Sequence, residues 1–326
     1  MEIFILEVQR YVQAYGVILP GHESFGDNVE EDVRDAERDD ELPPFDPTEP
    51  DFLQAVYRVE KQLLIVDLKK ESPIAYTGHS VVFKAYSQLY CQNVAVKIIN
   101  KMHIPAVVAD KFLARELEIT SRAHHPHICA CLSIFCVNAN RIAIVTEFCS
   151  RGTLSHLVMQ EKIIAGITNA ARMFRQLIEA IQYLHERNVA HRDIKLENIF
   201  LDEKCDVKLA DFGFARVINR AEKSTSFCGT KNYSSPSILR SKPYDHLPLI
   251  GSHREAESKH CWHSLPANVP SLSARYLIER LLTEDDLVRA GYEEILDSEW
   301  IRTHTNGKWI MADQHFVYEI LDSPNS

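Results

Sequence analysis

Short runs of hydrophobic residues, separated by polar turns, follow one another from Phe52 to about residue 150. The run 94–99 alternates strictly, so Ala95, Lys97 and Ile99 share one face of an extended chain. A lysine on an apolar face is costly unless it is paired, although a surface lysine on an edge strand is the alternative. We predict strands at residues 62–66, 80–86, 94–99, 128–135 and 142–148.

Helical periodicity takes over in the second half of the chain. Residues 168–188 carry apolar side chains at three- and four-residue steps, among them Ala171, Phe174 and Ile178. Residues 110–123 are rich in Ala, Leu and Glu and also predict a helix. We predict further helices after Arg151, at residues 273–282 and 292–300, and a short one within residues 1–20.

The composition is that of a soluble globular protein, with 45% hydrophobic and 25% charged residues in 326. This length suits one two-lobed enzyme or two small domains. No apolar run is long enough to span a bilayer, and the N-terminus has Glu2 and Glu7 where a signal peptide has basic residues. We therefore expect a cytoplasmic or nuclear protein with no membrane partner.

The net charge of −10 is concentrated in residues 23–51, which hold thirteen acidic residues against Arg34 and Arg38. This stretch also carries four prolines, so we expect disorder, with an acidic docking or autoinhibitory tail as the alternative. The remainder is close to neutral, which argues against a nucleic-acid-binding surface.

The eight cysteines form no CxxC pair, so the sequence signals neither a zinc site nor a disulfide framework. We expect reduced thiols. The run His124-His125-Pro126-His127 allows a metal cluster, but a loop that enters a strand is the simpler interpretation.

Candidate chemistry gathers in residues 189–211. Asp193, Lys195 and Asn198 stand at fixed offsets between short apolar runs, and Asp211 follows Asp193 by 18 residues. Asn198 and Asp211 offer oxygen ligands for a divalent ion, Asp193 a base and Lys195 a cation. This set suits phosphate held on Mg²⁺.

The run 191–198, His-Arg-Asp-Ile-Lys-Leu-Glu-Asn, resembles the catalytic loop of protein kinases, and Asp211-Phe212-Gly213 resembles their metal-binding turn. Lys195, two residues after Asp193, is typical of the serine/threonine class. Runs at residues 112–116, 209–216 and 226–230 are most similar to the testis-specific serine kinase branch, near the calcium/calmodulin-dependent group.

The resemblance implies an α+β, bilobal fold with a small antiparallel β lobe that carries one helix, and a mainly helical large lobe. The kinase-like domain would span residues 52–303. The small lobe would occupy 52–147 and the large lobe 148–303, between an N-terminal extension, 1–51, and a C-terminal tail, 304–326.

The cofactors that the resemblance implies are ATP and Mg²⁺. Lys97 would bind the α- and β-phosphates, oriented by Glu116, with Glu118 as the competitor on composition alone. Thr146 would stand beside the adenine. Hinge backbone groups of Glu147 and Cys149 would bind the base, and Val82, Ala95 and Phe200 would enclose it.

The catalytic roles follow from the same resemblance. Asp193 would accept or orient the proton of the substrate hydroxyl, Lys195 would neutralise the γ-phosphate, and Asn198 and Asp211 would hold the metal ion. Thr230 would support Asp193 and Lys195 from the peptide side.

The resemblance also implies a regulatory site. Ser226 matches the usual phosphorylation position, so an upstream kinase would add a phosphate there that pairs with Arg192. An ordinary serine-rich loop is the alternative.

Three departures stand against this pattern. Ala75, Thr77 and Ser80 replace the three glycines of the phosphate-covering loop and Gly78 lies one place off, so we predict reduced ATP affinity. Ser237 stands where the family has a glutamate, which pairs there with a buried arginine matched here by Arg289. Without that glutamate, we expect Arg289 to turn to Glu293, Asp285 or water.

The third departure is the largest. Only 52 positions separate Ser237 from Arg289, and residues 240–270 lack the long apolar helix of the family. We therefore expect a shortened large lobe, through a deletion, a splice product or a gene-model error.

Three interpretations follow. The first is an ATP-dependent serine/threonine kinase that phosphorylates Ser/Thr hydroxyls of protein substrates. The second is a weak or inactive kinase-like binding or scaffold module, and the third is a poorly folded fragment. We favour the first, because all six chemical positions are intact: Lys97, Glu116, Asp193, Lys195, Asn198 and Asp211.

Overall fold

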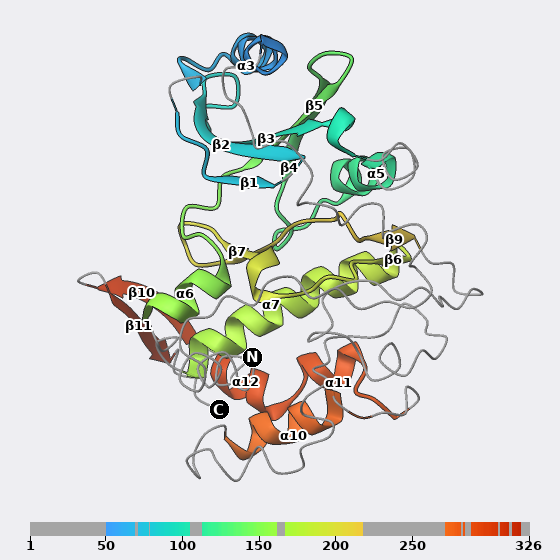
Figure 1. Ribbon diagram of the computed structural model, residues 1–326. Helices are drawn as coiled ribbons and strands as arrows, with labels where there is room; N and C mark the ends of the chain where they lie inside the picture. Colours follow the sequence, from blue (N-terminus) through green and yellow to red (C-terminus); the bar gives the residue numbers. More distant parts are fainter. Residues whose placement is uncertain are drawn as a thin grey trace, which may run out of the picture.

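The computed structural model describes most of two lobes. The described residues are 50–68, 71–77, 79–104, 113–161, 167–217, 271–281, 283, 288–305, 307–312 and 315–320. A sheet-containing small lobe stands above a mainly helical large lobe (Figure 1). The expectations for residues 1–20, 23–49 and 238–270, including the shortened large lobe, fall outside the described residues.

The small lobe is built on one five-stranded antiparallel sheet in the order β1-β2-β3-β5-β4. Side chains alternate across it, and those of Val81, Phe83, Val94, Val96 and Val145 are buried on one face. The prediction of strands over 80–86, 94–99, 128–135 and 142–148 is confirmed within a few residues. The strands are β1 Ala75–Thr77, β2 Ser80–Ser87, β3 Gln92–Asn100, β4 Cys131–Cys136 and β5 Arg141–Glu147.

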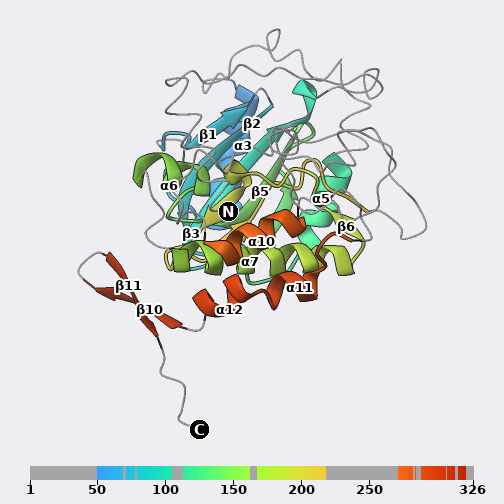
Figure 2. The ribbon, with the colours of Figure 1, turned by 90° about the horizontal axis from the view of Figure 1, so that it is seen from below.

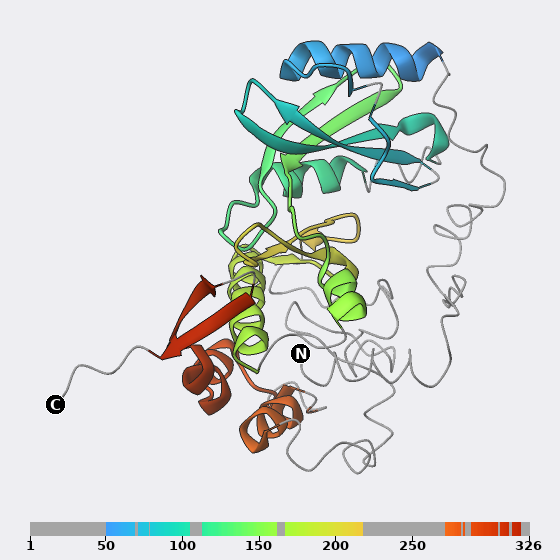
Figure 3. The ribbon, with the colours of Figure 1, turned by 90° about the vertical axis from the view of Figure 1, so that its left-hand side faces the viewer.

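The prediction of a strand at residues 62–66 is wrong, because helix α3, Pro50–Leu63, ends there. Phe52, Val56, Val59 and Leu63 recur at three- and four-residue steps and are buried against the outer face of the sheet. The run 63–66 is apolar enough for a strand, but the longer stripe that precedes it determines the helix. Figure 3 shows α3 lying across the top of the small lobe.

Polar contacts fix α3 to the turn between β4 and β5. The carboxylate of Asp51 accepts hydrogen bonds from Arg141 Nε at 2.6 Å and from Asn138 Nδ2 at 2.8 Å. Arg58 Nη1 donates to the carbonyl of Val137 at 2.5 Å. The Arg141 side chain is buried, so Asp51 supplies the charge that its guanidinium requires.

Another helix among the described residues of the small lobe is α5, Ala114–Arg122, which packs beside β4. It confirms the described part of the helix predicted at residues 110–123. A short 3-10 helix, η3 Lys101–His103, follows β3, capped by the Asn100 side chain.

Helix α7, Ile167–Glu186, is the core of the large lobe, as the periodicity predicted. Its Phe174, Ile178, Ile181 and Leu184 are buried. Helices α10 Leu272–Leu281, α11 Tyr292–Leu296 and α12 Glu299–Thr305 lie along its lower side (Figure 2), where Trp300 packs 5.9 Å from Phe174. The helices predicted at 273–282 and 292–300 are confirmed, the second as two shorter helices.

Short elements above α7 carry the loops that face the small lobe. Helix α6, Leu154–Glu161, follows the interlobe connection as predicted. Strand β6 Val189–Ala190 pairs with β9 Arg216–Val217, and β7 Ile199–Leu201 pairs with β8 Val207–Leu209, with the 3-10 turn η5 Leu196–Asn198 between them.

The predicted C-terminal tail contains a hairpin. Strands β10 Gly307–Ala312 and β11 His315–Ile320 pair in antiparallel register and project beside the large lobe (Figure 3). Within the described part of the chain, no helix has the length and apolar character needed to cross a bilayer. The six cysteines in this part carry free thiols.

Candidate active site

Lys97 of β3 and Glu116 of α5 form an ion pair, with Nζ 3.1 Å from Oε1. Burial alone would lower the pKa of Lys97, but the charges of Glu116 and Asp211 outweigh it, and the net shift is upward. The lysine therefore stays cationic. The competitor, Glu118, pairs instead with Arg122 at 2.7 Å on the exposed side of the same helix.

The β register places apolar neighbours beside Lys97. Val82 stands directly opposite Lys97, and Ala95 stands opposite Thr146. Directly opposed residues share a face, as do residues two apart, so Val82 and Ala95 lie on the face of Lys97. The sheet thus brings together the cation and two of the residues expected to enclose a base.

The loop after β6 buries an acid between two nitrogen donors. Asp193 is 2% exposed, and its Oδ2 lies 2.8 Å from Lys195 Nζ and 2.9 Å from Asn198 Nδ2. The same amide also donates to the Asp193 carbonyl at 2.9 Å. These contacts hold the Asp193 side chain in one orientation, as a proton acceptor requires.

His191 ties this loop to the strand before Asp211. Its Nε2 lies 3.1 Å from the Ala210 carbonyl, and its Nδ1 lies 3.4 Å from the Asp193 backbone nitrogen. Burial lowers the pKa of His191, so a neutral ring donates through Nε2 and accepts through Nδ1. The ring also packs 5.2 Å from that of Phe212.

The turn at Asp211 has a left-handed backbone, and Gly213 lies close to two carboxylates. Asp211 has φ of +66°, and its Oδ1 accepts the Gly213 N–H at 3.2 Å. A Cβ at Gly213 would stand 3.3 Å from Asp211 Oδ1 and 3.8 Å from Glu116 Oε2. A side chain at this position would therefore press on the Asp211 carboxylate and meet the Glu116 carboxylate at ordinary contact distance.

Asn198 and Asp211 supply side-chain oxygens of the kind that Mg²⁺ prefers. Among the described residues, no group of three or more His, Cys, Asp or Glu side chains could hold a metal ion on its own. The chemistry of this pair fits an ion that takes its other oxygens from a nucleotide and from water.

The hinge contains a contact that the sequence did not predict. Glu147 Oε1 accepts hydrogen bonds from the Ala130 N–H at 2.8 Å and from Lys208 Nζ at 3.0 Å, and its N–H donates to the Ala130 carbonyl at 3.0 Å. Glu147 raises the pKa of Lys208 against the opposing effect of burial. The apolar neighbours of Lys208 were the only signal in the sequence for this half-buried lysine.

The other expected site residues are placed as follows. Cys149 is buried and Phe200 half-buried beside the hinge, whereas Gly78, Ser226 and Thr230 lie outside the described residues. Arg289 Nε donates a hydrogen bond to the Thr283 carbonyl at 2.9 Å.

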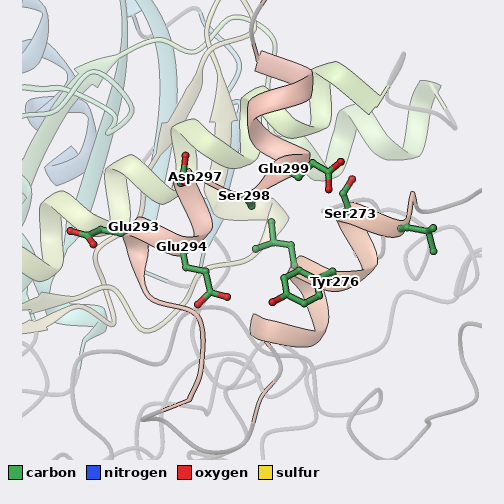
Figure 4. A pocket seen from close by; sticks show the side chains of 9 residues that line it. Ser273, Tyr276, Glu293, Glu294, Asp297, Ser298 and Glu299 are labelled. Atoms are coloured by element: carbon green, nitrogen blue, oxygen red, sulfur yellow. The ribbon is translucent and has the colours of Figure 1, made fainter.

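A hollow of about 830 Å³ opens at the base of the large lobe, away from these residues. Tyr276 of α10 and Glu294 of α11 lie toward it (Figure 4), and Glu294 is held by Arg280 through two hydrogen bonds. It is lined by Leu272, Ser273, Tyr276, Leu277, Glu293, Glu294, Asp297, Ser298 and Glu299.

Comparisons with known proteins agree with this arrangement. The family model of the protein kinase domain matches residues 71–248. Testis-specific serine/threonine-protein kinase 3 of Mus musculus is 32% identical over 247 residues, covering 68% of this chain and 91% of that protein. Testis-specific serine/threonine-protein kinase 2 of Mus musculus is 35% identical over 195 residues, covering 58% of this chain and 52% of that protein.

NUAK family SNF1-like kinase 1 of Mus musculus is 36% identical over 151 residues, which cover 46% of this chain. The match spans only 23% of that relative's length. The extent of the family match and the similarity to the testis-specific kinases show that this chain belongs to the protein kinase family, on its serine/threonine side.

Proposed function

We propose that this chain transfers the γ-phosphate of Mg-ATP to serine and threonine hydroxyls of protein substrates. The observation that carries the proposal is the Lys97–Glu116 ion pair, formed across two elements, together with the contacts of the buried Asp193 with Lys195 and Asn198. A pair of this kind positions a cation for phosphate.

Each residue has a distinct role in the proposed reaction. Lys97 would bind the α- and β-phosphates, and Asn198 and Asp211 would hold Mg²⁺, whose charge offsets that of the phosphates. Asp193 would take or orient the proton of the attacking hydroxyl. Lys195 would stabilise the negative charge on the γ-phosphate during transfer.

The nucleotide base would lie between the small-lobe sheet and β7. Val82, Ala95 and Phe200 would contact its faces, and backbone groups of Glu147 and Cys149 would bind its edge. The Glu147 side-chain contacts with Ala130 and Lys208 support this role, because they fix the hinge residue in place.

Phosphorylation of Ser226 by an upstream kinase is part of the proposal, with Thr230 supporting Asp193. Burial, followed by the positive charges of Arg192 and Arg216, lowers the pKa of Arg115. Three neighbouring guanidinium groups favour an anion in their midst, and a phosphoserine would supply one.

A transfer assay with Mg-ATP and a mixed protein substrate tests the function. The wild-type chain, phosphorylated beforehand, should exceed the Asp193→Asn variant by about 100-fold or more, because that variant lacks the proton acceptor. Equal transfer by the two chains would refute the proposed activity.

The second candidate is a kinase-like binding module with weak or absent transfer. The loss of three glycines, with Thr77 and Ser80 bonded to each other at 2.9 Å, favours it. A melting curve separates the two functions: a transition raised only by Mg²⁺ and ATP together indicates a working nucleotide site. A cooperative transition that ignores nucleotide indicates the binding module.

A further inference from the structure

We infer that Thr77 competes with the phosphates of a bound nucleotide for the backbone N–H of Ser80 and thereby lowers the affinity of this site for phosphate. The inference rests on the proposed function, since it concerns the loop that covers the same nucleotide. It assigns the reduced ATP affinity that the sequence predicts to one hydroxyl group and not to the lost glycines in general.

The tip of the β1–β2 hairpin is closed by side-chain contacts. Thr77 and Ser80 stand opposite each other in the β register. Thr77 Oγ1 lies 2.9 Å from Ser80 Oγ and accepts the Ser80 backbone N–H at 3.2 Å. One threonine hydroxyl therefore engages both polar groups that Ser80 presents at this tip.

These hydroxyls lie on the face of the sheet that carries Lys97. Ser80 precedes Val82 by two residues, and Val82 stands opposite Lys97. Residues two apart and residues directly opposed share a face, so Thr77 and Ser80 share the face of Lys97. The other face is buried under α3, and Figure 1 shows β1 on the side of the sheet toward the large lobe.

Backbone N–H groups in such a turn are natural ligands for phosphate oxygens. A hydroxyl fixed in the same hairpin competes with any phosphate for the N–H, because it is always present at bonding distance. Glycine at position 77 would carry no such group. The competition acts only on ligands that bear phosphate, so it should lower the affinity for nucleotides and leave the affinity for adenosine unchanged.

Isothermal titration calorimetry on the full chain tests this inference with adenosine, Mg-ADP and Mg-ATP. The variants are Thr77→Val, which keeps the β-branched shape without the hydroxyl, and Thr77→Gly, which removes the side chain. Thr303→Val, at an exposed position on α12, is the matched control. We expect both Thr77 variants to bind Mg-ADP and Mg-ATP about five-fold more tightly than wild type and to bind adenosine equally well.

The outcomes separate this inference from the proposed function. Unchanged Mg-ADP affinity in the Thr77 variants overturns the inference and leaves the function intact. Weaker Mg-ADP binding also overturns it, because the hydroxyl would then be a phosphate ligand. Failure of every folded chain to bind adenosine or Mg-ADP overturns the nucleotide site itself. Cooperative melting of each variant is established before titration. If Thr77→Val or Thr77→Gly does not melt cooperatively, the affinity of the other Thr77 variant tests the inference.

Discussion

Helix α3 contains two leucines that the structure places in opposite environments, which allows a test within one element. Leu63 is fully buried against the sheet, whereas Leu53 is 44% exposed on the outer side of the helix. Leu63→Ala removes buried methyl groups and leaves a cavity, which costs about 3 kcal/mol in the free energy of unfolding. Leu53→Ala removes a similar number of atoms and should cost less than about 0.5 kcal/mol.

For a folded unit of roughly 200 residues, each kcal/mol lowers the melting temperature by about 2 to 4 °C. Leu63→Ala should therefore melt about 6 to 12 °C below wild type, and Leu53→Ala within about 2 °C of it. Thermal melts followed by circular dichroism give both values. Equal losses at the two leucines would refute the burial of α3, and with it the correction of the predicted strand.

Three further predictions concern the site. Glu116→Gln should lower phosphate transfer about 10- to 100-fold, because Lys97 loses its partner. The control Glu118→Gln should change the transfer rate less than about two-fold. Similar losses in the two variants would show that Glu116 is not the partner of Lys97. Lys208→Met should lower the free energy of unfolding, measured in urea, by about 1 kcal/mol. In a double-mutant cycle with Glu147→Gln, the two losses should not add, whereas additive losses would show that the two side chains do not interact. The folded pKa of His191 lies below the unfolded value of 6.5, so its contribution to stability is complete above pH 6.5 and falls as the pH drops below it. His191→Gln should melt with a flatter pH dependence than wild type between about pH 7.5 and 5.5, and parallel curves would contradict a buried neutral ring.

The candidate catalytic residues could be found in the sequence because their signals are local. Asp193, Lys195 and Asn198 stand within six residues of one another, and the structure joins them directly. Glu116 was separated from Lys97 by 19 residues, and only the resemblance to a family chose it over Glu118. The side-chain roles remain proposals, but the geometry agrees with that choice.

What the sequence did not show depends on long-range or competing signals. The Glu147–Lys208 contact joins residues 61 positions apart, and no local pattern marks such a pair. The run 63–66 matched a strand pattern. The helix forms instead because the apolar stripe of α3, which ends at Leu63, is buried against the sheet. For Arg289, no local pattern indicated the hydrogen bond that its Nε donates to the backbone carbonyl of Thr283.

The ring of His191 contacts the backbone nitrogen of Asp193, the carbonyl of Ala210 and the ring of Phe212. Its position gives the molecule an internal spectroscopic reporter. The aromatic ring current of Phe212 should shift the imidazole proton resonances, and a change in the position of the Phe212 ring should change that shift. A histidine-selective NMR spectrum would therefore follow the orientation of the Asp211–Gly213 turn, with no attached dye and no substrate turnover.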